Sequence, residues 1–210
     1  GKLFEVDRAD GSTSSIGSSG YPFIVDLAYR EVDQMVYGLV GEEELAMLVS
    51  YDVITGTTTF KNEVALETDR FIKAGFTHQK STDLFYFVLG GDIDVLGWEN
   101  VDGTVAGRGT EALPDNNVLA LAFDNENEIL YGANSGTLFQ INKETGAIEA
   151  QIIFLDFLGL LASMNFDPIK KVLVATSDLG NVYAIDPTSG QLAYMFTTDP
   201  LVTGITYAGE

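Results

Sequence analysis

The 210-residue chain is 46% hydrophobic and carries 31 acidic against 11 basic residues, which gives a net charge of −20. Such an acidic protein repels phosphate backbones and anionic lipid surfaces, so no nucleic-acid partner is expected. The absence of cysteine excludes disulfides, thiolate metal sites and cysteine nucleophiles. No apolar run reaches the roughly 18 residues of a spanning helix, so no membrane insertion is expected. The acidity favours an extracellular, cell-surface or periplasmic location.

Short strand-like runs separated by turn residues fill the chain. Within 114–155 they lie at 118–124, 129–133, 137–142 and 147–154, and the segments between them are polar or contain glycine. This alternation indicates an antiparallel meander. The meander recurs roughly every 45 residues, which is typical of a β-propeller. The expected blades are 21–66, 67–113, 114–155 and 156–198, and a last blade that joins 199–210 to 1–20.

One marker of this repeat is an Asp, Glu or Asn four residues before a turn glycine. Its side chain can accept hydrogen bonds from backbone N–H groups of the turn, and the glycine can adopt a positive φ. The pairs are Asp7/Gly11, Asp52/Gly56, Glu99/Gly103, Asn142/Gly146 and Asp186/Gly190. We therefore expect this acidic series to be structural and not catalytic.

A second marker is an aromatic residue near the end of each expected inner strand. These residues are Tyr29, Phe76, Phe123, Phe166 and Tyr207. Period-two alternation places them between blades and turns the opposite, small or polar side of each strand toward a central channel. The predicted channel residues are Asp26, Lys73, Ala120, Ser163 and Gly204, followed two positions later by Ala28, Gly75, Ala122, Asn165 and Thr206.

These patterns predict an all-β fold, with a single β-propeller domain over 1–210 and five four-stranded blades. The last blade is expected to be closed by strands from both ends of the chain, which protects the sheet edges. Between Tyr207 and Leu3, however, this blade lacks a second strand of roughly eight to ten residues. Either the blade has three strands, or the chain is a fragment of a larger propeller.

Two nine-residue strings carry a resemblance to known repeats. Leu138-Phe-Gln-Ile-Asn142-Lys-Glu-Thr-Gly146 and Val182-Tyr-Ala-Ile-Asp186-Pro-Thr-Ser-Gly190 resemble the LYxIDxxTG hairpin of NHL-like, YVTN-like and quinoprotein-like propellers. The resemblance implies the fold and little about activity, because one fold hosts many functions. Quinoprotein-like repeats usually place a Trp after the turn, whereas Trp98 lies before it, which argues against a quinone cofactor.

Candidate ligand-binding residues lie in the expected channel and on the loops that lead into the inner strands. They are Tyr21, Asp26, Asp69, Arg70, Lys73, Asn116 and Asn165. Carboxylate and amide oxygens suit Ca²⁺, and Asp26 and Asn165 are the candidate metal ligands inside the channel. The alternatives are solvated turn residues and, for Asp26, a salt bridge to Lys73 on the neighbouring blade.

The sequence favours a non-enzymatic binding module over an enzyme. His78 is the only histidine, and no GxSxG, P-loop, GxGxxG or HExxH motif is present. Loops that differ between blades suit recognition of a protein or glycan partner. The alternative is a calcium-dependent hydrolase of lactonase or glycosidase type that uses the channel, with Asp26 and Asp69 as a carboxylate pair. A third reading is a propeller domain of a larger extracellular assembly.

Overall fold

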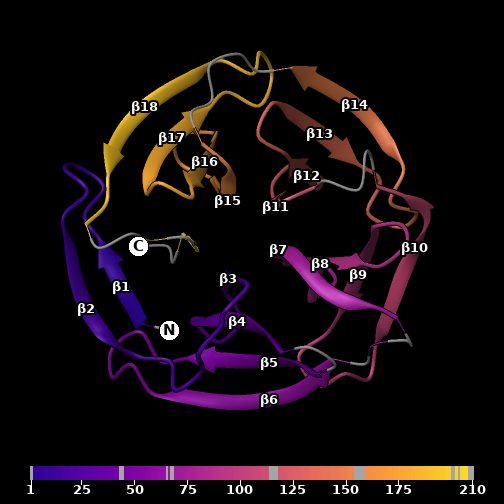
Figure 1. Cartoon of the computed structure of the whole chain (residues 1–210), viewed down its shortest axis with the longest axis horizontal. Helices are drawn as coiled ribbons and strands as arrows, with labels where there is room; N and C mark the ends of the chain where they lie inside the picture. Colours follow the sequence, from indigo (N-terminus) through magenta and orange to yellow (C-terminus); the bar gives the residue numbers. More distant parts are fainter. Residues whose placement is uncertain are drawn as a thin grey trace.

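The computed structural model describes residues 2–42, 45–64, 66, 69–113, 118–153, 159–199, 202 and 204–207. In this part of the chain every regular element is a β-strand. The strands form four four-stranded sheets and one two-stranded sheet around a common axis (Figure 1). The predicted all-β propeller is therefore confirmed. No helix in the described residues is long and apolar enough to cross a membrane.

Each four-stranded sheet is one blade, with its first strand nearest the axis (Figure 1). The first contains β3 (Asp26–Arg30), β4 (Met35–Glu42), β5 (Leu45–Tyr51) and β6 (Thr58–Val64). The second contains β7 (Phe71–Gln79), β8 (Leu84–Gly90), β9 (Val95–Glu99) and β10 (Ala106–Ala112). The third contains β11 (Ala120–Asp124), β12 (Ile129–Ala133), β13 (Thr137–Ile141) and β14 (Ile148–Ile153). The fourth contains β15 (Leu161–Asp167), β16 (Val172–Ser177), β17 (Asn181–Ile185) and β18 (Leu192–Thr197).

Position within the blade explains the composition of each strand. The second strand of a blade is covered on both faces by neighbouring blades, so β8 reads LFYFVLG and is buried along nearly its whole length. The outermost strand faces solvent on its free side, so β10 reads AGRGTEA and is mostly exposed. Successive strands are antiparallel and joined by short turns, as a meander requires.

The turns between third and fourth strands have the predicted chemistry. For example, Oδ1 of Asp186 accepts hydrogen bonds from the backbone N–H groups of Thr188 and Ser189 at 2.7 and 2.9 Å. Gly190 closes the same turn with a φ of 71°. In the second blade, Glu99 was predicted to accept the hydrogen bonds of the turn. This prediction was wrong, because Oδ1 of Asn100 accepts the hydrogen bond from the backbone N–H of Val105 at 3.0 Å. Glu99 ends β9 and is buried.

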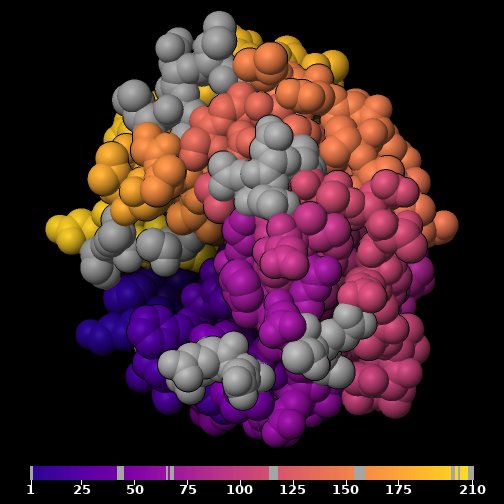
Figure 2. All heavy atoms as spheres, turned by 45° about the vertical axis from the view of Figure 1, so that its right-hand side comes forward, coloured from indigo at the N-terminus to yellow at the C-terminus, as the bar shows by residue number. Residues whose placement is uncertain are grey.

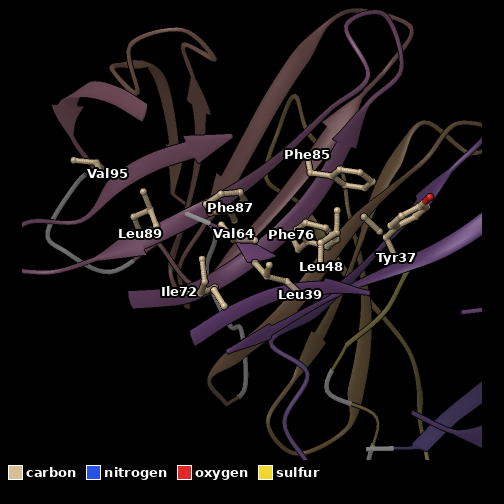
Figure 3. Close-up of a cluster of buried hydrophobic side chains, with 12 residues drawn as sticks. Tyr37, Leu39, Leu48, Val64, Ile72, Phe76, Phe85, Phe87, Leu89 and Val95 are labelled. Atoms are coloured by element: carbon tan, nitrogen blue, oxygen red, sulfur yellow. The ribbon is translucent and has the colours of Figure 1, made fainter. Parts of the chain in front are cut away.

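The hydrophobic core lies between the blades. In the cluster shown in Figure 3, Phe85 of β8 packs against Tyr37 of β4 and Phe76 of β7, with both ring centroids 5.0 Å away. Similar clusters fill the contacts between the second and third and between the third and fourth blades. The predicted interblade aromatics Phe76, Phe123 and Phe166 are all buried there. Since adjacent blades share one core, the inner strands are held at fixed positions around the channel.

The described residues form four four-stranded blades and one two-stranded sheet, so the predicted count of five four-stranded blades is not confirmed. The two-stranded sheet of β1 (Lys2–Val6) and β2 (Thr13–Ser18) lies beside the end of the chain, where indigo and yellow segments meet in Figures 1 and 2. Thr13 donates a hydrogen bond to the carbonyl of Asp199 at 2.9 Å. Residues 204–207 lie against β3 and β15, but they form no strand.

Candidate functional site

A cavity of about 500 Å³ opens at the end of the channel where the inner strands β3, β7, β11 and β15 finish. We call this cavity the channel pocket. Each of the five sequence repeats contributes its inner segment to the wall. The contributing residues include Tyr29, Thr77, Phe123, Asn165 and Thr206. Convergence of the inner strands on one axis makes these distant residues neighbours.

The wall of the channel pocket combines aromatic rings with uncharged hydrogen-bonding groups. Its aromatic residues are Tyr29, Phe123, Phe166 and Tyr207. Its polar groups include the Asn165 amide, whose Nδ2 donates to the hydroxyl of Thr206 at 3.4 Å. The wall therefore offers aromatic surface for packing and polar groups that can fix the orientation of a ligand.

Charged side chains at the mouth are paired across neighbouring blades. Lys80 of the second blade forms an ion pair with Glu31 of the first. Lys171 of the fourth blade forms an ion pair with Glu126 of the third. The backbone N–H of Lys80 also donates to Oδ1 of Asn125 at 2.6 Å. The mouth therefore presents compensated charges on turns that the interblade contacts hold in place.

His78 takes part in a similar interblade contact and faces the same pocket. Arg30 of β3 donates two hydrogen bonds of 2.7 Å to the carboxylate of Asp83, and Nε2 of His78 lies 3.0 Å from Oδ1 of that carboxylate. Burial lowers the pKa of His78, and the hydrogen bond with Asp83 partly offsets this. The hydrogen bonds from Arg30 lower the pKa of Asp83. His78 is thus a neutral, positioned side chain at pH 7.

Asp26 lies deeper in the channel and is almost fully buried. Its Oδ1 accepts hydrogen bonds from the Ser163 hydroxyl at 2.6 Å and from the Leu27 backbone at 2.9 Å. Its Oδ2 accepts from the Phe76 backbone at 3.1 Å. Burial raises the pKa of Asp26 to about 8, against the opposing effect of these hydrogen bonds. A carboxyl group that is mostly protonated at pH 7 is a poor ligand for Ca²⁺.

The predicted salt bridge between Asp26 and Lys73 was wrong, because Lys73 forms its ion pair with Asp94 in the turn before β9. Asp69 and Arg70 precede β7, at the opposite end of the channel from the channel pocket. Tyr21 lies in the segment before β3, also at that end. Asn116 falls outside the described residues.

Of the predicted ligand residues that the structure describes, only Asn165 lines the channel pocket. The sequence reasoning placed binding on the loops that lead into the inner strands, whereas this cavity lies where those strands end. Four of the five aromatic markers were the signal for it, since Tyr29, Phe123, Phe166 and Tyr207 all line the pocket. Among the described residues, no group of three or more Asp, Glu and His side chains is arranged to hold a metal ion.

Comparison with known proteins identifies the fold. No protein-family model and no curated protein sequence matches this chain. A crystal structure described as a nidogen/laminin complex aligns with a TM-score of 0.63 and 15% identity, over 92% of this chain and 88% of that one. A structural-genomics protein of unknown function from Bacteroides thetaiotaomicron aligns with a TM-score of 0.66 and 15% identity. That alignment covers all of this chain but 62% of the other. These structures support the β-propeller fold.

Proposed function

We propose that this protein is a non-enzymatic binding propeller, and that a partner protein docks where the channel pocket opens. The main support for this proposal is the pocket itself, which has a volume of about 500 Å³ and is lined by residues from all five sequence repeats. A protruding loop of the partner fits this arrangement, because aromatic walls accept an apolar side chain while Asn165 and Thr206 offer hydrogen bonds.

Exposed apolar side chains around the mouth favour a protein over a glycan. Ile169 lines the pocket and is 64% exposed, and Val32 in the neighbouring turn is 65% exposed. Apolar side chains that flank a pocket are typical of protein contact surfaces. The net charge of −20 favours a basic partner through long-range attraction. The structural neighbour described as a nidogen/laminin complex adds support, since that propeller fold occurs in a protein complex.

The pairing of charges supports binding without catalysis. A general acid or base needs a pKa near the working pH and access to the substrate. His78 is buried and its Nε2 is engaged by Asp83, and Lys80 and Glu31 are paired with each other. An extracellular or surface location, a glycan ligand, bound Ca²⁺ and kinship to NHL-, YVTN- or quinoprotein-like repeats all stay predictions.

We further infer that β1, β2 and residues 204–207 together occupy the position of a fifth blade. Ile205 donates its backbone N–H to the Ser163 hydroxyl at 3.1 Å, and Gly204 packs beside Asp26. Residues 204–207 therefore take the innermost place between β15 and β3. The hairpin of β1 and β2 takes the outer places, between β18 and β6 (Figure 1).

The test is site-specific photocrosslinking. A photoreactive phenylalanine derivative replaces Ile169 at the pocket mouth, or Ile54 as a matched control. Ile54 is 89% exposed at the tip of the β5–β6 turn and does not line the pocket. The proposal predicts a crosslinked protein from Ile169 that Ile54 does not capture. The purified partner should then bind Ile169→Asp about tenfold or more weakly than it binds Ile54→Asp.

Two results would overturn this proposal. One is equal capture from both positions, which would indicate non-specific adhesion. The other is an unchanged affinity for Ile169→Asp when circular dichroism shows that the variant is folded. Binding of an oligosaccharide that is lost in Asn165→Leu, without any protein partner, would assign the pocket to a glycan instead.

A further inference from the structure

A second cavity, of about 490 Å³, lies inside the fifth-blade position. One side is formed by β1 and the other by Val202 and residues 204–207. The two neighbouring blades supply the remaining walls, through Leu27 and Val36 on one side and Phe166 and Val174 on the other. We call it the blade cavity. It lies where each of the other four blades has its second strand.

The backbone of β1 is ready to pair on this side. The Asp7 N–H donates to the Ser12 carbonyl at 2.8 Å, so Asp7 points toward β2. Backbone groups alternate in direction along an antiparallel strand, so Phe4 and Val6 point their N–H and C=O groups toward the blade cavity. Within the described residues, β1 pairs with β2 alone. An unpaired strand edge is a template for another strand.

The walls specify what kind of strand fits. In the complete blades the second strand is buried on both faces, as in β12 with the sequence ILYGA. The blade cavity likewise has apolar side chains from both neighbouring blades. An occupant therefore needs apolar or small residues on both faces and an extended backbone, because its N–H and C=O groups must meet the edge of β1.

We propose that the blade cavity binds an extended peptide segment of a partner polypeptide, which adds as the missing second strand antiparallel to β1. The segment completes a four-stranded fifth blade. Residues 204–207 form a wall of this cavity and also contribute Thr206 and Tyr207 to the channel pocket. Strand addition therefore also supports the wall of the channel pocket.

The probe is a synthetic peptide with the sequence of residues 127–135, NEILYGANS, which contains β12. In the third blade, Gly132 of β12 lies opposite Phe139 of β13. By analogy, Gly132 of the peptide should lie opposite Phe4 of β1, and Leu130 of the peptide opposite Val6. The control peptide is N-methylated at Gly132, which removes one backbone donor and leaves every side chain intact. We expect saturable binding of the first peptide, a rise in the melting temperature, and slowed amide exchange at Phe4 and Val6. The methylated peptide should bind about tenfold or more weakly.

Protein variants locate the binding. Phe4→Pro removes the N–H that faces the cavity and leaves the pairing of β1 with β2 possible, whereas Phe4→Ala keeps that N–H. We expect Phe4→Pro, and not Phe4→Ala, to abolish peptide binding. If Phe4→Pro does not fold, Val174→Lys, which places a charge in the cavity wall, takes its place. The Ile169→Asp variant should bind the peptide as the wild type does. Peptide binding in the blade cavity and partner docking at the channel pocket can therefore be tested independently of each other.

The inference is overturned if the unmodified peptide does not bind at millimolar concentration. It is also overturned if the methylated peptide binds equally well, because the contact is then not a backbone ladder. Equal binding to wild type and Phe4→Pro, or protection of amides away from β1, would place the peptide elsewhere.

Discussion

The Ser163 hydroxyl on β15 donates a 2.6 Å hydrogen bond to Oδ1 of Asp26 on β3, although the two residues lie 137 positions apart. Oδ2 of the same carboxyl accepts the backbone N–H of Phe76 on β7. The Ser163 oxygen in turn accepts the N–H of Ile205. One buried carboxyl group therefore links three blades and the C-terminal inner segment around the channel.

The first prediction concerns the pH dependence that this carboxyl gives to stability. Burial raises the folded-state pKa of Asp26 to about 8, above its ordinary value of 3.8. Between these values the folded state holds a proton that the unfolded state has lost, so this group makes the free energy of unfolding fall as the pH rises from 4 to 8. The slope is at most about 1.4 kcal/mol per pH unit. Asp26→Asn should remove it.

Urea unfolding of both proteins at pH 5, 6, 7 and 8 measures the difference. The wild type should lose stability relative to Asp26→Asn as the pH increases. A stability difference from Asp26→Asn that stays constant over this range would mean that Asp26 is ionised in the folded protein. Because only the difference between the two proteins counts, titration of the other acidic residues cancels.

The second prediction concerns calcium. Protonated Asp26 has both oxygens engaged by backbone or hydroxyl donors, so Ca²⁺ should raise the melting temperature of wild type and Asp26→Asn equally, relative to a chelator. Differential scanning fluorimetry at pH 7 with millimolar Ca²⁺ provides the measurement. A rise of several degrees in the wild type alone would restore Asp26 as a metal ligand and reopen the hydrolase alternative.

The third prediction uses His78, which is the only histidine and so gives an unambiguous NMR signal. Its pKa should lie below 6.5, because burial disfavours the imidazolium. Asp83 partly offsets this, so Asp83→Asn should lower the pKa of His78 further. The free energy of unfolding should decrease as the pH falls from 6.5 to the folded-state pKa of His78. The reason is that the unfolded state gains a proton there that the folded state does not. A higher pKa of His78 in Asp83→Asn would contradict the contact between His78 and Asp83.

The fourth prediction concerns Gly75, which bends β7 at a φ of 61°. A Cβ atom there would lie 2.8 Å from Cγ and 2.9 Å from the backbone nitrogen of Leu121 on β11. Gly75→Ala combines backbone strain with a clash between blades and should cost about 2–4 kcal/mol of unfolding free energy. Gly136→Ala, with nothing within 4 Å of the new Cβ, is the control and should change it by less than about 0.5 kcal/mol. Equal effects in chemical denaturation would show that the close approach of β7 and β11 is not maintained in solution.

The sequence by itself determined the strands, the turns and the face of each inner strand. Those features depend on neighbours within a few residues, as when Asp186 caps its own turn or when Asp26 and Ala28 alternate with Leu27 and Tyr29. The propeller followed from the repetition of such local units. Even Asp26 and Asn165 were placed correctly on the inner wall, because alternation alone sets that direction.

Only the tertiary structure decided how the blades meet. It paired Lys73 with Asp94 instead of Asp26, held His78 and Arg30 on one carboxylate, and put the channel pocket where the inner strands end. Within the described residues it also produced four four-stranded blades and a cavity beside β1. Arg30 and Asp83, for example, lie 53 positions apart, and their contact arises only when the first two blades pack against each other. No local pattern in the sequence encodes that geometry.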